Sequence, residues 1–132
     1  MENYGKLQRR FVESIPAKVF DRVNNVVNID FQLDTQTDGK GNVRNGYSGY
    51  VIPIDGHTSD YSHVKSQLIE AAYPQKDEFG LVMNFSALQY DIMNGNLTME
   101  DAAKTDDATA FGKFLEWRKL AASAAKLVTK NE

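Results

Sequence analysis

The chain has 132 residues, no cysteine, 15 basic and 18 acidic side chains, and a formal net charge of -3. A chain of this length buries about two thirds of its unfolded surface on folding, so we expect one domain over residues 1–132. Without cysteine there is neither a disulfide nor a thiolate metal site, and the near balance of charges argues against a dedicated nucleic-acid-binding protein.

Membrane insertion and export are also not predicted. No apolar run reaches the roughly 18 residues that a membrane-spanning helix requires. The first ten residues, MENYGKLQRR, are polar where a signal peptide would be apolar. We therefore expect no signal peptide, no transmembrane segment and no membrane partner.

Two helical segments are predicted at the start of the chain. Apolar residues in 4–11 have helical spacing and predict one or two turns. Ser14 followed by Pro16 has the residue types of a helix start, which predicts a second helix over residues 16–25.

The clearest periodic pattern follows in VVNIDFQLD, where every second residue from Val27 to Leu33 is apolar. A period of two with one apolar face predicts a half-buried strand. The segment GYSGYVIPID predicts a second strand that ends, or becomes an edge, at Pro53. Turn-forming residues between the two predict an antiparallel hairpin with a long loop over residues 35–45.

Helices are predicted for the rest of the chain. The first begins near Thr58 or Ser59 and ends before Pro74, and the second covers residues 77–93. The residues expected to be buried by the second helix are Phe79, Val82, Met83, Leu88 and Ile92. A short turn capped by Thr98 precedes the strongest helix, over residues 106–130. The predicted fold class is α+β, with a hairpin or small sheet packed against three to four helices.

No catalytic motif is present, so we expect a protein that is not an enzyme and has no catalytic residue, cofactor or metal. Residues 34–42 resemble the start of a calcium-binding loop, but Gln36 and Asn45 stand where such a loop has ligands. The segment with Asp55, His57, Asp60 and His63 offers groups for metal binding or a general base. Its spacing matches no known ligand pattern, and ordinary surface histidines are the simpler interpretation.

Two candidate interfaces are predicted. Residues 35–50 combine Tyr, Gly, Asn and Ser with one arginine, a composition typical of adaptable contact loops. Small residues on the last helix allow close approach of a second helix, either in this chain or in a partner. The candidate interface residues are Arg44, Tyr47, Tyr50, Ala121, Ala124 and Ala125.

Four short segments carry a resemblance to a known class of proteins: Tyr73-Pro74, Asp77-Glu78, Val82-Met83-Asn84, and Phe114-Leu115-Glu116-Trp117-Arg118 with its trailing alanines. They resemble small phage and prophage virion-associated proteins. The resemblance covers about residues 73–128 and is to tail or tail-fibre accessory proteins. It implies a structural component in a virion or in the host cytoplasm, which acts as an oligomer with itself or with other virion proteins. The alternative is a monomeric binding module that uses residues 35–50 for a glycan, a peptide or a calcium ion.

Overall fold

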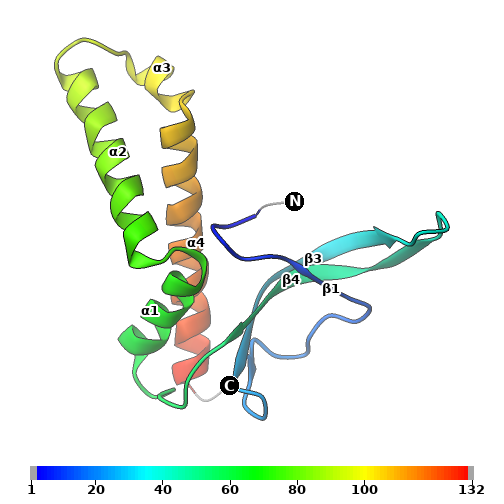
Figure 1. Cartoon of the computed structure of the whole chain (residues 1–132). Helices are drawn as coiled ribbons and strands as arrows, with labels where there is room; N and C mark the ends of the chain where they lie inside the picture. The colour runs from blue at the N-terminus through cyan, green and yellow to red at the C-terminus, as the bar shows by residue number, and fades with distance from the viewer. Residues whose placement is uncertain (1–2, 131–132) are drawn as a thin grey trace.

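The computed structural model describes residues 3–130, in which a four-stranded antiparallel sheet is followed by four helices (Figure 1). The strands are β1 (Arg10–Val12), β2 (Phe20–Asp21), β3 (Val26–Thr37) and β4 (Val43–Pro53). The helices are α1 (Tyr61–Ala72), α2 (Gln75–Met93), α3 (Met99–Ala103) and α4 (Asp106–Thr129). The predicted α+β class and the long C-terminal helix are confirmed.

The sheet is built around the β3–β4 hairpin, and its strand order is β1-β4-β3-β2. The ladder runs without a long loop from the Val26–Pro53 pair to the Thr37–Val43 pair. At the tip, the Asp38 carboxylate accepts hydrogen bonds from the backbone N–H groups of Lys40 and Asn42, which closes a short turn. The predicted hairpin is thus confirmed, but the loop expected over residues 35–45 is wrong, because most of it continues the ladder.

The two helices predicted before the hairpin are absent from the described chain. Residues 10–12 form β1 against β4, and Phe20–Asp21 forms β2 against β3. Between them the chain runs over the surface, with Ile15 exposed. The apolar spacing of these segments is compatible with a helix, but the free edges of the long hairpin offer backbone partners that a helix would not use. Tertiary pairing therefore overrides local periodicity here.

The core lies where the base of the sheet meets α1 and α4, away from the tip of the hairpin (Figure 1). The largest of its fully buried side chains are Trp117 and Phe114 of α4, Tyr50 of β4 and Leu68 of α1. The ring centroids of Tyr50 and Trp117 lie 5.5 Å apart in an edge-to-face arrangement. The sheet and the helices therefore share one hydrophobic cluster.

Helix α2 extends beyond this core as one arm of a helical hairpin with α4, to which α3 connects it (Figure 1). The Phe85 and Phe111 rings stack at 4.2 Å between the two arms. No residue of α2 is fully buried. The expected burial of Phe79, Val82 and Met83 is wrong, since all three are exposed.

Polar side chains cap the starts of three helices. The caps are Asp60 for α1, Thr98 for α3 and Thr105 for α4. Thr98 is the predicted cap of α3. The cap of α1 is Asp60, whereas the sequence predicts Thr58 or Ser59. Among residues 3–130, no helix combines the length and the apolar character needed to cross a bilayer.

Gly5 fixes the N-terminal segment against the end of α1. Its φ is 53°, in the left-handed region, and a Cβ atom there would overlap the carbonyl oxygen of Ala72. That oxygen accepts the Lys6 backbone N–H at 2.9 Å. We expect Gly5→Ala to lower the free energy of unfolding by at least about 2 kcal/mol, because backbone strain adds to the overlap.

Urea unfolding followed by circular dichroism measures this loss. Gly112→Ala is the matched control, since Gly112 lies inside α4 and a Cβ atom there meets nothing within 4 Å. The control should raise the free energy of unfolding by about 0.4–1 kcal/mol. Equal effects of the two substitutions would contradict the role assigned to Gly5.

Candidate functional site

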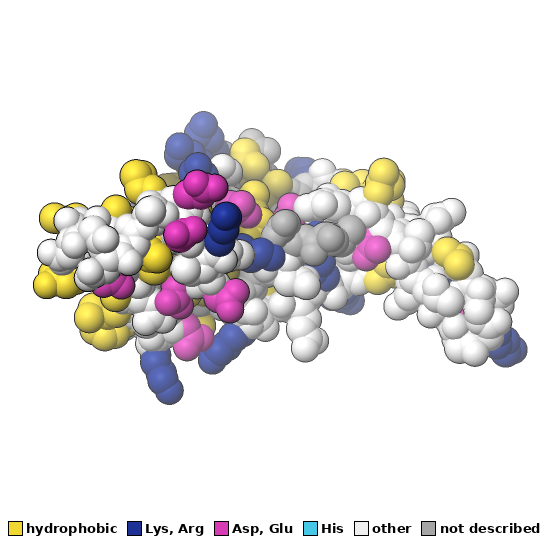
Figure 2. Space-filling model, turned by 90° about the horizontal axis from the view of Figure 1, so that it is seen from above, with side chains coloured by type: hydrophobic (Ala, Val, Ile, Leu, Met, Phe, Trp, Pro, Cys, Tyr) yellow, Lys and Arg dark blue, Asp and Glu magenta, His cyan; other side chains and the backbone are white. Residues whose placement is uncertain are grey.

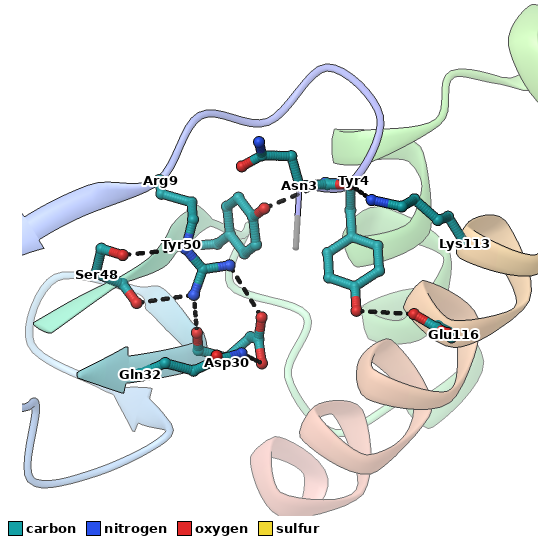
Figure 3. Close-up of polar contacts among 9 residues, drawn as sticks. All are labelled: Asn3, Tyr4, Arg9, Asp30, Gln32, Ser48, Tyr50, Lys113 and Glu116. Atoms are coloured by element: carbon teal, nitrogen blue, oxygen red, sulfur yellow. Dashed lines mark hydrogen bonds and ion pairs between the residues drawn. The ribbon is translucent and has the colours of Figure 1, made fainter. Parts of the chain in front are cut away.

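The N-terminal segment joins the sheet to α4 through a connected set of polar contacts (Figure 3). The backbone N–H of Tyr4 donates to the Tyr50 hydroxyl at 3.2 Å, and the Tyr4 hydroxyl donates to Glu116 at 3.2 Å. Arg9 donates to the Asp30 carboxylate at 3.0 Å and to the Ser48 hydroxyl at 3.1 Å. These contacts use backbone groups and paired charges to hold elements together, so we interpret the network as structural.

The predicted interface residues on β4 have different environments. Arg44 lies on the exposed outer part of the hairpin and pairs with Glu13. Tyr47 is half-buried in the ladder opposite Leu33. Tyr50 is buried in the core, where its ring is 6.1 Å from that of Tyr4. Of these three side chains, Arg44 is the one that is exposed to a partner.

The predicted interface alanines lie inside the fold. Ala121, Ala124 and Ala125 are almost completely buried and belong to the core cluster. Their small side chains allow α4 to pack closely within this chain, which is the intramolecular alternative stated above. These residues and Tyr50 are therefore unavailable to a partner unless the chain unfolds.

The exposed face of α2 carries a row of apolar side chains, three of which the sequence predicts to be buried. Taking 100° per residue, six positions fall within an arc of about 100° on this helix. We call them the α2 outer stripe: Phe79, Val82, Met83, Ser86, Tyr90 and Met93. Phe79 is 68% exposed and Met93 is 85% exposed. Figure 2, which looks down on the molecule, shows hydrophobic side chains at the outer edge of the helical end.

A second apolar row on α2 faces the rest of the chain. Leu81 packs against the core cluster, and Phe85 stacks on Phe111 of α4. Leu88 and Ile92 are half-buried and continue this row on roughly the opposite side from the outer stripe. The sequence signal for this exposed face is that α2 has two apolar rows at helical spacing. A single neighbouring helix of the same chain can cover only one of them.

The segment that resembles a calcium-binding loop does not bring its carboxylates, Asp34 and Asp38, together in one site. The Asp38 carboxylate serves the hairpin turn, and hydrogen bonds from the Asn42 and Lys40 backbone N–H groups hold its pKa below the usual value. Asp34 lies in the ladder opposite Gly46, several residues before the turn. The two carboxylates are therefore used by separate parts of the hairpin.

Asp55, His57 and His63 come together between β4 and the first turn of α1. The His63 Nε2 atom is 2.8 Å from Asp55 Oδ2, and the His57 Nδ1 atom is 3.5 Å from Asp55 Oδ1. Hydrogen bonds from the His57 backbone N–H and the His63 ring hold the pKa of the Asp55 carboxyl below its usual value. Asp60, the fourth residue considered from the sequence, instead accepts the His63 backbone N–H as the α1 cap.

Comparison with known proteins adds no family to this geometry: no protein-family model matches the chain, and no significant match is found among curated proteins or solved structures. Function is therefore inferred from the surfaces of the chain described above.

Proposed function

We propose that this protein is a non-enzymatic assembly component that associates through the α2 outer stripe with a second copy of itself. One observation carries the proposal: α2 has an apolar row on each of two faces, and one of them is exposed over about 21 Å of helix length. A helix that is apolar on opposite sides is typical of one buried on both sides. Exposed rows of this kind mark contacts with other proteins.

The arrangement of the stripe favours a second copy as its partner. Ser86 is at the centre, with Val82 and Tyr90 four residues to either side and Phe79 and Met93 seven residues to either side. An antiparallel pair of α2 helices related by a twofold axis at Ser86 places Phe79 opposite Met93 and Val82 opposite Tyr90. The small serine at the crossing point allows close approach of the two helices. No charged residue lies on the stripe, so self-pairing brings no like charges together.

The resemblance of residues 73–128 to phage virion-associated proteins supplies the proposed setting. That segment includes all of α2 and most of α4. A structural role in a virion, with assembly in the host cytoplasm, is compatible with a protein whose main exposed feature is an apolar helix face. Other virion proteins are further candidates for contact with the exposed hairpin, where Arg44 lies.

Light scattering over a concentration series tests the proposal. A single helix pair of this length covers less than the about 800 Å² per partner of a standard interface, so the dimer should dissociate on dilution in the micromolar range. Tyr90→Glu places one charge in each of the two Val82–Tyr90 contacts and should weaken dimerisation by about 100-fold or more. Asn84→Glu adds the same charge to an exposed position outside the stripe and should leave the dissociation constant unchanged.

The absence of cysteine allows a direct test of the symmetry. Ser86→Cys introduces a single thiol at the proposed twofold axis, and mild oxidation should give a disulfide-linked dimer at high yield. Asn84→Cys, which faces away from the axis, should not crosslink efficiently. A wild-type protein that remains monomeric at all concentrations, or equal crosslinking of the two variants, would reject pairing through this stripe.

A further inference from the structure

We propose that Asp55, His57 and His63 form a binding site for one divalent transition-metal ion of the zinc class. The three residues supply two imidazole nitrogens and one carboxylate, and the candidate ligand atoms all lie within 4.8 Å of one another. His57 and His63 are the two histidines of the chain. Both of its imidazoles therefore face the same carboxylate, with ring centroids 5.3 Å apart.

The distances suit a common ion. Ligand atoms about 2.1 Å from a tetrahedral zinc ion lie about 3.4 Å from each other. The His63 Nε2 atom is 2.8 Å from Asp55 Oδ2, and the His57 Nδ1 atom is 3.5 Å from the other carboxylate oxygen, so the two separations lie on either side of this value. All three side chains are exposed or half-buried, so small side-chain rotations can bring the atoms onto one ion without disturbing the core.

The backbone on both sides of the cluster is fixed. Asp55 follows Ile54, which is buried and donates its N–H to Asn25 at 2.9 Å. His63 precedes Val64, which is completely buried at the start of α1. Within the loop, the His57 N–H donates to Asp55 at 3.0 Å. The ligands are thus held near one another before an ion binds, which reduces the entropy lost on binding.

The ligand types select the metal. Imidazole nitrogen favours zinc and its neighbours, whereas calcium and magnesium prefer oxygen ligands. Three protein ligands leave a coordination position for water, as in open zinc sites. A bound ion would connect the loop after β4 to the first turn of α1. This site is independent of the α2 outer stripe and of the proposed association.

Isothermal titration of the full chain with zinc chloride tests the site, with magnesium and calcium chloride as comparison ions. We expect one zinc ion per chain, no comparable binding of the other two, and shifts of both imidazole signals in NMR spectra during the titration. Loss of a group that only orients a ligand weakens metal affinity by about 10–100-fold. Loss of a ligand in His57→Gln, His63→Gln or Asp55→Asn should therefore weaken zinc binding by about 100-fold or more.

Asp107→Asn is the matched control, because it removes an exposed carboxylate at the start of α4, and it should leave zinc affinity unchanged. Circular dichroism should show that all four variants are folded. Absence of zinc binding at millimolar concentration, one ion per two chains, or unchanged affinity in His63→Gln would each overturn the proposal.

Discussion

Replacing Trp117 by alanine should lower the free energy of unfolding by about 3–5 kcal/mol. The side chain is completely buried, and its ring contacts Tyr4 of the N-terminal segment and Tyr50 of β4, with centroids 5.4 and 5.5 Å away. Its Nε1–H donates to the Leu68 carbonyl of α1 at 2.9 Å. Truncation therefore leaves a cavity where four parts of the fold meet, and local collapse cannot fill it without moving one of them.

Urea unfolding should be followed by circular dichroism, because the chain has one tryptophan and the substitution removes its fluorescence. Phe79→Ala is the control, measured at a protein concentration low enough for the chain to be monomeric, since it truncates an aromatic side chain that is 68% exposed. It should then change the free energy of unfolding by no more than about 0.5 kcal/mol. The same control should weaken dimerisation if the outer stripe is an interface. A loss below about 1.5 kcal/mol for Trp117→Ala would mean that the core is not organised around this residue.

Replacing Arg9 by methionine should lower the free energy of unfolding by about 3–5 kcal/mol, the range for breaking a buried ion pair. The Arg9 and Asp30 side chains are only 8% and 14% exposed. The guanidinium also donates to the Ser48 carbonyl and lies 4.9 Å from the centre of the Tyr50 ring. Methionine retains most of the aliphatic packing, so the loss comes mainly from leaving the Asp30 carboxylate without its cationic partner, with a hydrogen bond from the Gln32 amide still in place.

A double-mutant cycle with Asp30→Asn isolates the pair. Asp30 has a φ of 58° beside the irregularity in β3, and asparagine tolerates this left-handed conformation. The double variant should be less destabilised than the sum of the single variants, because it contains no uncompensated charge. Lys104→Met breaks the exposed pair with Glu100 and should change the free energy of unfolding by about 0.5 kcal/mol or less. A similarly small effect of Arg9→Met would show that the Arg9 contacts contribute little.

The Arg9 network also shows a limit of sequence interpretation. Arg9 lies within residues 4–11, whose apolar spacing predicts a helix, and an arginine there would be expected on a solvated flank. In the fold it lies against the bulged part of β3, 21 residues later, and against Ser48 of β4. Neither the bulge nor the sheet edge that brings these groups together is encoded by neighbouring residues.

The sequence by itself determined much of the local secondary structure of this protein. The alternation from Val27 to Leu33 specifies a strand, and the strand is confirmed. The predicted buried face is confirmed only for Val27 and Ile29, because the register shifts between Ile29 and Gln32, and Leu33 beyond it is 76% exposed. Acidic and hydroxyl side chains at helix starts, with apolar residues at helical spacing, predict the bounds of the helices between residues 61 and 129 to within a few positions. These features depend on side-chain period and on hydrogen bonds within one turn of helix, so nearby residues are enough to specify them.

Only the tertiary structure decided which apolar face of α2 is covered and which side chains from separate segments meet. Both rows of α2 have helical period, and α4 packs on the one with Leu81 and Phe85, so the outer stripe is exposed. Likewise, Asp55 and His63 meet because the chain reverses between β4 and α1. Periodicity describes an element relative to its own axis, whereas burial and the convergence of ligands depend on where the other elements lie.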